Sequence, residues 1–258
     1  GVVYVNHTHR QIHSFQALGK THPVYAHLPT VLNEQGEKMS KRNGAKAVTQ
    51  YRDEGYLPDA MVNYLARLGW SHGDDEIFSR DQFLSWFDLD HLGKSAAQFD
   101  EAKLKWVNAQ HLKACSGDQL AQWVKPWLSP EAKGDSQRLA ARCDLFKDRC
   151  DTLCGLAEWI NRMVGPVHAK PEDLTQHLTQ SIKPALSAFA NELKTVEWTA
   201  PAIAALIKSV LQTHQIKMPQ LAMPVRVLVL GTPQTPSLDQ VLALSDRDRV
   251  VQLIQAGL

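Results

Sequence analysis

The sequence lacks the features that would place it in several special classes. Its four cysteines, at positions 115, 143, 150 and 154, form no CxxC pair, which predicts thiols in a reducing, cytoplasmic compartment. No apolar run approaches the roughly 18 residues of a membrane span, and no signal-peptide pattern opens the chain, so we expect no membrane partner. Lys and Arg number 28 against 27 Asp and Glu, a net charge of +1, so any nucleic-acid site must be a local patch.

The pattern of apolar residues predicts a mainly helical chain. Strands are expected only near the start, over residues 2–5 and 24–28, with a helix over 10–18 between them. Beyond residue 44, cap and stripe signals predict that helices begin near Pro58, Ser79, Asp100, Thr199 and Ser237, and that one long helix covers 137–164. Linker-like stretches fall near 129–136 and 165–171.

The segment Lys38-Met39-Ser40-Lys41-Arg42 is the sharpest motif. Three cations lie within five residues, with a small hydroxyl between them. This pattern is typical of a compact polyphosphate site, in which ammonium groups stabilise the charge that moves onto phosphate oxygens during displacement. Gly36 and Gly44 bracket the segment and allow a loop to close over a nucleotide. By itself, such a segment is equally compatible with a solvated basic hairpin.

The sequence around this loop resembles the bacterial class I glutamyl-tRNA synthetases. The resemblance covers essentially the whole chain in family order and is most specific over 27–108; the segments that carry it are 27–29, 33–44, 50–58, 63–71, 99–108, 224–227 and 235–238. It implies ATP-dependent activation of glutamate and transfer to glutamate tRNA. The implied partners are that tRNA, L-glutamate and ATP with Mg²⁺ as a substrate complex, with no tightly bound cofactor, in a cytoplasmic monomer.

The resemblance also implies a division of the chain. We expect the residual second half of a Rossmann α/β domain over 1–33 and a connector with the basic loop and a stem contact over 34–115. Two α-helical anticodon-binding subdomains follow, over 116–164 and 165–258. A glutaminyl-tRNA synthetase is disfavoured, because its anticodon half consists of β-barrels whereas residues 110–258 read as helical.

In the family, the basic loop binds ATP. Lys38 and Lys41 are therefore the candidate catalytic residues that stabilise the phosphates, with Met39, Ser40 and Arg42 supporting the loop. Tyr4 is a further candidate, either stacked on adenine or an ordinary strand aromatic. The family usually has an acidic pair where Val2 and Val3 stand, which weakens that edge of the site.

Lys103 and Trp106 lie one helical turn apart and should share a face. A cation beside an indole suits phosphate together with ribose or base contact. Taken alone, Trp106 fits a core position better, but the resemblance implies that the pair contacts tRNA.

The resemblance assigns anticodon reading to Arg149, Arg226, Pro236 and Leu238. Arg149 is expected on the long helix, and without the resemblance it would be interpreted as a solvated charge. Its planar guanidinium can form two parallel hydrogen bonds with a base edge. Ser237 stands where the family usually has Gly, which narrows backbone access there.

No metal site is expected. The eleven histidines fit no ligand spacing, and the cysteines at 143, 150 and 154 are expected on one helix face in the core.

A HIGH-type histidine motif is missing from the sequence, since His7-Thr8-His9 lacks the following glycine. We therefore expect the chain as given to be inactive alone in glutamate activation. The alternative is a non-catalytic tRNA-binding module or a synthetase paralogue that keeps the loop.

Overall fold

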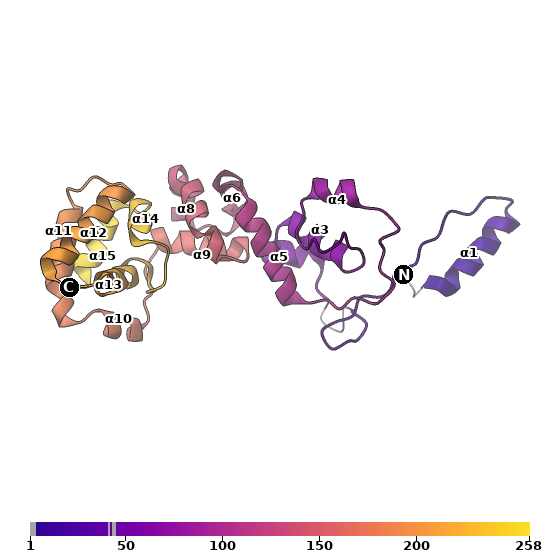
Figure 1. Ribbon diagram of the computed structural model, residues 1–258, viewed down its shortest axis with the longest axis horizontal. Helices are drawn as coiled ribbons and strands as arrows, with labels where there is room; N and C mark the ends of the chain where they lie inside the picture. Colours follow the sequence, from indigo (N-terminus) through magenta and orange to yellow (C-terminus); the bar gives the residue numbers. More distant parts are fainter. Residues whose placement is uncertain (1–3, 41, 43–44) are drawn as a thin grey trace. The chain divides into compact units, whose positions relative to one another are not determined.

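The computed structural model describes residues 4–40, 42 and 45–258. They divide into two compact units, residues 1–114 and 115–258 (Figure 1). The described residues contain isolated β-bridges but no extended strand, so the prediction of a mainly α fold is confirmed. None of the described helices is both long enough and apolar enough to cross a membrane.

The first unit contains five α-helices among its described residues. They are α1 (Val5–Ala17), α2 (Val48–Asp53), α3 (Pro58–Arg67), α4 (Arg80–Trp86) and α5 (Glu101–Ala114).

The start of this unit differs from the sequence-based expectation. Val5 opens α1, and residues 24–28 form no strand, so both strand predictions are wrong as far as the residues are described; residues 2 and 3 lie outside the described part. A strand needs a partner for its backbone groups, and the described residues offer none here. The helix predicted over 10–18 is confirmed within α1, which buries none of its side chains.

The core of the first unit lies between α3 and α5. An aromatic cluster belongs to this core: the ring of Phe99, just before α5, lies 5.2 Å from that of Tyr64 on α3 and 6.3 Å from that of Tyr51 on α2. The Tyr64 hydroxyl donates to the Asp100 carbonyl at 2.9 Å. The buried Asn108 accepts from the backbone N–H of Leu57 at 2.8 Å. These bonds satisfy the polar groups at the starts of two helices.

The second unit contains ten α-helices in its described residues. They are α6 (Gly117–Trp123), α7 (Pro130–Gly134), α8 (Leu139–Phe146), α9 (Leu153–Val164), α10 (Pro171–His177), α11 (Lys183–Leu193), α12 (Ala200–His214), α13 (Met218–Leu230), α14 (Leu238–Ala243) and α15 (Arg247–Ala256).

The long helix predicted over 137–164 is wrong, because the chain breaks between α8 and α9. A short 3-10 turn, Lys147–Arg149, ends α8, and Cys150 takes an extended conformation. Thr152 then starts α9, its hydroxyl accepting from the N–H of Gly155 at 3.2 Å. Arg149 therefore lies on a turn at the end of a helix and not on a helix face.

This break also separates the cysteines that were expected on one helix face. Cys143 lies on α8, Cys150 in the break and Cys154 on α9, and none forms a disulfide. Cys143 and Cys150 are nevertheless buried in the core, and burial raises the pKa of each thiol to about 12. Such thiols stay protonated and unreactive at neutral pH.

Most of the predicted helix starts are confirmed. The capping box at Ser79 is present: its hydroxyl accepts from the N–H of Gln82 at 3.1 Å, and Gln82 accepts from the N–H of Ser79 at 2.8 Å. Thr199 caps α12. The linker predicted near 129–136 is wrong, because Ser129 caps the short helix α7 there. The linker predicted near 165–171 is confirmed over residues 165–170, which connect α9 to α10 without a helix.

Candidate nucleotide loop and nucleic-acid surfaces

A tight turn precedes the basic loop. The side-chain oxygen of Asn33 accepts from the N–H groups of Gln35 at 3.1 Å and Glu37 at 2.8 Å. Gly36 adopts φ +79°, a left-handed conformation that favours glycine. A bridge between Leu32 and Lys38 closes the turn. The turn brings the chain back, so that Lys38 begins the basic segment directly after it.

The basic segment offers its charges to solvent. Lys38 and Arg42 are exposed and form no ion pair with any described residue, while Met39 and Ser40 are half-buried. Lys41, one of the two predicted catalytic lysines, lies outside the described residues. Two unpaired cations on one short segment remain available to an anionic ligand.

Lys46 anchors the chain after the loop, a role that the sequence did not suggest. Its ammonium group contacts the carboxylates of Glu54 at 3.1 Å and Glu101 at 2.5 Å. The hydrogen bond to Glu101 is the main cause that raises the pKa of Lys46 above its usual value. Because Glu101 is distant in sequence, no local spacing predicts this contact.

Tyr4 lies beside α1 and not with the loop. Its exposed ring meets the His7 ring edge-on at 5.8 Å, and its carbonyl accepts from the Thr8 hydroxyl at 3.3 Å. Among the described residues, no hydrogen bond, ion pair or ring contact joins Tyr4 to the basic segment. The interpretation of Tyr4 as a strand aromatic is wrong, since it precedes a helix.

Lys103 and Trp106 share one face of α5, as predicted. The Lys103 ammonium lies 4.0 Å from the centre of the Trp106 ring and 2.7 Å from the Glu76 carboxylate. Its hydrogen bond to Glu76 holds the pKa of that carboxyl below its usual range. Trp106 is 41% exposed, so the alternative of a core tryptophan is wrong. The ring and the cation together form a surface suited to RNA.

A cavity of about 290 Å³ adjoins this pair; its lining includes Tyr64, Arg67, Glu76, Asp100 and Lys103. The Nη1 atom of Arg67 is buried and has no hydrogen-bond partner among the described residues. No sequence signal marks Arg67 as functional, because it belongs to a helix whose apolar stripe explains the neighbouring residues.

Three of the four predicted anticodon residues lie together in the second unit. Arg149 and Pro236 line one pocket of about 710 Å³. The Nη2 atom of Arg226 donates to the Pro236 carbonyl at 3.4 Å. Burial, with a smaller effect of the nearby Arg149 charge, lowers the pKa of Arg226. The exposed Arg149 guanidinium and the half-buried Arg226 thus flank Pro236.

The fourth predicted residue, Leu238, does not line this pocket. It is 1% exposed and packs in the core at the first turn of α14. A helix does begin at Ser237, as its cap signal predicts, but the cap itself is absent: the Ser237 hydroxyl donates to the Gln240 side chain at 2.7 Å and caps no backbone group.

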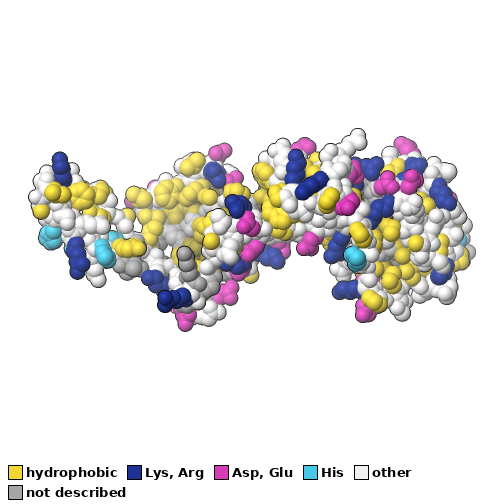
Figure 2. Space-filling model, turned by 180° about the vertical axis from the view of Figure 1, so that it is seen from behind, with side chains coloured by type: hydrophobic (Ala, Val, Ile, Leu, Met, Phe, Trp, Pro, Cys, Tyr) yellow, Lys and Arg dark blue, Asp and Glu magenta, His cyan; other side chains and the backbone are white. Residues whose placement is uncertain are grey.

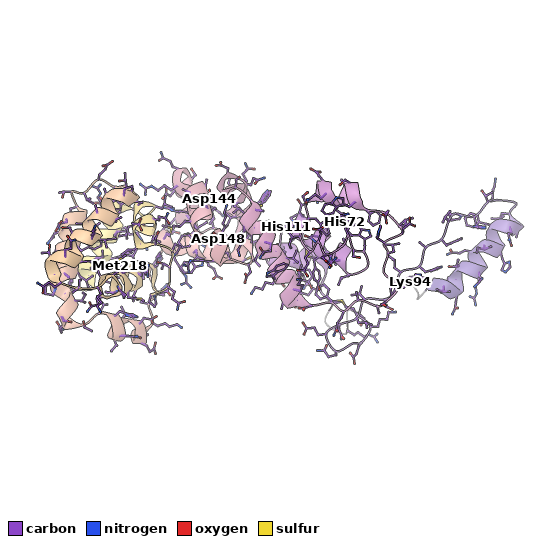
Figure 3. All side chains as sticks on the ribbon, in the orientation of Figure 1. His72, Lys94, His111, Asp144, Asp148 and Met218 are labelled. Carbon is purple, nitrogen blue, oxygen red and sulfur yellow. The ribbon has the colours of Figure 1, made fainter. Side chains whose placement is uncertain are left out.

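Sequence reasoning missed the other polar residues of the pocket, which are Gln240 and the two acids Asp144 and Asp148. Figure 3 labels the two acids. Asp144 accepts from Lys147 at 2.8 Å. Asp148 is exposed and forms no ion pair with a described residue. Without the break after α8, a helical wheel places these acids on an ordinary solvated face, so no sequence signal identifies them.

The charges on the surface are mixed. Figure 2 shows Lys and Arg side chains intermixed with Asp and Glu on the face that it displays. Among the described residues, no group of His, Cys, Asp or Glu side chains is placed to hold a metal ion.

Comparisons with known proteins match both units. Residues 1–106 match the family described as tRNA synthetases class I (E and Q), catalytic domain, and residues 119–258 match the family described as anticodon binding domain. The glutamate–tRNA ligase of Polaromonas naphthalenivorans is 66% identical over 250 residues, covering 96% of this chain and 54% of its own length. That of Delftia acidovorans is 64% identical over 254 residues, with the same coverage of 96% and 54%.

Solved structures share the fold. A crystal structure of a glutamate tRNA ligase from Elizabethkingia meningosepticum, in complex with its amino acid, has a TM-score of 0.86 at 22% identity. A glutamate–tRNA synthetase from Elizabethkingia anophelis has a TM-score of 0.82 at 23% identity. Each match covers 100% of this chain and 55% of the other. The chain spans about half the length of the relatives it matches.

Proposed function

Because this chain belongs to the glutamate–tRNA ligase family and corresponds to its C-terminal portion, we propose that it recognises the anticodon arm of glutamate tRNA. We further propose that it contributes the ATP-phosphate loop to the ligase reaction. In that reaction glutamate is activated with ATP and transferred to the tRNA. The cell compartment for this work is the cytoplasm, and the acting form is a monomer.

The observation that carries the proposal is the pocket shared by Arg149 and Pro236. RNA loops are read through unstacked bases, which proteins hold by stacking, apolar contact and hydrogen bonds to base edges. The pocket supplies apolar contact through Ala141, Leu145 and Pro236, and the exposed Arg149 guanidinium can donate hydrogen bonds to a base edge. Arg226, which does not line the pocket, donates to the Pro236 carbonyl.

Elsewhere on the chain, two surfaces support contacts outside the anticodon. The Lys103 ammonium over the Trp106 ring suits a phosphate with an adjoining ribose. The exposed Lys38 and Arg42 suit ATP phosphates, and Mg²⁺ arrives with the nucleotide. Lys38, together with Lys41, would stabilise charge that develops on the pyrophosphate as it leaves.

Binding of isolated anticodon arms tests the proposal. The 258-residue chain is titrated with a labelled stem-loop carrying the glutamate anticodon and with one that has the same stem and a scrambled loop, at one salt concentration. Since one specific base contact discriminates by about 1–3 kcal/mol, or about 5- to 150-fold, the glutamate arm should bind at least fivefold more tightly. Equal affinity for the two arms would contradict the proposal.

A further inference from the structure

The pocket that holds Arg149 carries unused hydrogen-bond acceptors as well as donors. Asp148 and Arg149 are neighbours on the turn Lys147–Arg149, both are exposed, and both line the pocket. A carboxylate only accepts hydrogen bonds, whereas a guanidinium only donates them. The two side chains therefore present a complementary pair of groups to one ligand edge.

The two carboxylates of the pocket are not equivalent. Asp144 is engaged by Lys147 at 2.8 Å, and the same ammonium donates to the Cys115 carbonyl at 2.8 Å. Asp148 has no ion-pair partner in the described part of the chain. An unpaired carboxylate repels a phosphate, so Asp148 weakens any general attraction of the pocket for the RNA backbone. It is useful only to a partner that presents a hydrogen-bond donor.

The same pocket contains a second hydrogen-bond donor, Gln240. The Oε1 atom of Gln240 already accepts from Ser237 at 2.7 Å, which leaves its amide N–H₂ as the group to offer. Gln240 lies on α14, distant in sequence from the turn that carries Asp148, and both residues line the pocket. The pocket thus combines one unpaired acceptor, the donors of Arg149 and Gln240, and the apolar side chains of Ala141, Leu145 and Pro236, which suit the face of a base.

We propose that Asp148 determines specificity by accepting a hydrogen bond from the exocyclic amino group of cytosine at the third anticodon position. The inference rests on the proposed function. Cytosine presents an N4–H₂ donor next to its N3 and O2 acceptors, which matches a carboxylate beside a guanidinium. Uracil replaces that donor by the O4 acceptor, which a carboxylate repels.

The genetic code selects the position. Glutamate anticodons have uracil or cytosine at the first position, uracil at the second and always cytosine at the third. An acceptor that requires an amino group therefore fits the third base alone in every glutamate tRNA. Arg149 donates to the N3 and O2 acceptors of the same edge, and Asp148 adds recognition of the exocyclic amino group, a hydrogen-bond donor that a guanidinium cannot accept from.

The test measures binding of stem-loops that differ only in the third anticodon base, cytosine against uracil, to the wild-type chain and to two matched variants. Asp148→Asn removes the negative charge and supplies an amide that can donate to O4. The preference for cytosine should fall by about 5- to 150-fold, the range of one base contact. Asp144→Asn removes the same charge on the same pocket and should keep the wild-type preference within about twofold, because its partner is Lys147.

An unchanged preference in Asp148→Asn, or an equal change in both variants, would overturn the inference. A wild-type chain that prefers the glutamate arm over the scrambled one but does not distinguish cytosine from uracil would overturn it as well. Failure of the wild-type chain to prefer the glutamate arm would instead contradict the proposed function. Asp148→Glu keeps a carboxylate acceptor and should retain a preference for cytosine. Loss of that preference in Asp148→Glu, with a fold shown to be intact by circular dichroism, would also count against the inference.

Discussion

The guanidinium of Arg142 donates twice to the carbonyl of Leu244, through Nε at 3.0 Å and Nη2 at 2.8 Å. Arg142 is fully buried on α8, and its Nη2 atom also lies 2.6 Å from the Asp135 carboxylate. Leu244 is the residue that ends α14. This contact joins α8, which precedes Arg149, to the end of α14, which follows Pro236. It therefore holds the two sides of the pocket in place relative to each other.

Replacing Arg142 by Met should destabilise the second unit strongly. The change leaves the Leu244 carbonyl and Asp135 without their partner, and breaking a buried pair typically costs about 3–5 kcal/mol. Denaturant unfolding of the two chains measures the difference. Arg162→Met is the control, because Arg162 is exposed and meets the Trp159 ring at 5.4 Å, so its loss should cost about 0.5–1 kcal/mol. Similar losses in both variants would contradict the buried role.

Removing the charge of Lys103 should weaken tRNA binding without regard to sequence. A phosphate contact releases about one counterion, so Lys103→Ala should reduce the slope of log affinity against log salt by about 1. Trp106→Leu should instead lose about 1–3 kcal/mol of stacking with little change in slope. Lys113→Ala, an exposed charge on the same helix, is the control. If Lys103→Ala and Lys113→Ala change the slope equally, the Lys103–Trp106 surface does not contact the tRNA.

Protonation of His111 should destabilise the first unit at mildly acidic pH. The imidazole is half-buried and lies 2.9 Å from the Asn63 side-chain oxygen, which also accepts from the N–H of Phe78 at 3.1 Å. Burial lowers the pKa of His111, an effect that nearby Asp59 opposes. Because the unfolded chain then binds the proton more tightly, the free energy of unfolding falls as pH drops through the ordinary histidine value of about 6.5.

The measurement compares unfolding at pH 7.5 and pH 5.5 for the wild type, for His111→Gln and for His9→Gln, whose imidazole is exposed. His111→Gln should show a smaller acid loss than the wild type, and His9→Gln should match the wild type. An acid loss that is the same in all three chains would assign the effect to other groups.

The basic loop should act on the rate of glutamate activation. In a protein that carries the complete catalytic domain, Lys38→Ala or Lys41→Ala should each lose about 2.7–4 kcal/mol of transition-state stabilisation, or about 10²- to 10³-fold in rate, by analogy with other removed donors. ATP–pyrophosphate exchange measures this, with the exposed Lys20 as the control position. A rate within about threefold of the wild type would mean that the loop does not serve the phosphates.

Local signals accounted for much of the helical fold. Ser79 and Thr199 cap helices because a side-chain oxygen can reach a backbone N–H a few residues on, a relationship visible in sequence. The break before α9 was missed although Thr152 and Gly155 carry the same kind of signal. The cysteine spacing favoured one continuous helix, and no glycine or proline interrupts 147–152.

The candidate site was less predictable from the residues. The convergence of Arg149, Arg226 and Pro236 depends on packing between helices distant in sequence, and their roles came from the family resemblance and not from spacing. Leu238 shows the limit of that transfer, since its side chain is in the core. Asp148 and Gln240 gave no signal, because exposed polar residues on helices are ordinary until the fold brings them to one pocket.

The most direct test of anticodon recognition is the Arg149→Gln variant, titrated with stem-loops of the glutamate and the glutamine anticodon at one salt concentration. Arg149 is exposed at the pocket rim, so the change should leave the fold intact. The account predicts that binding to the glutamate arm weakens by about 1–3 kcal/mol, while binding to the glutamine arm changes little, so that the gap between the two narrows. Equal losses for both arms, or no loss for either, would contradict it.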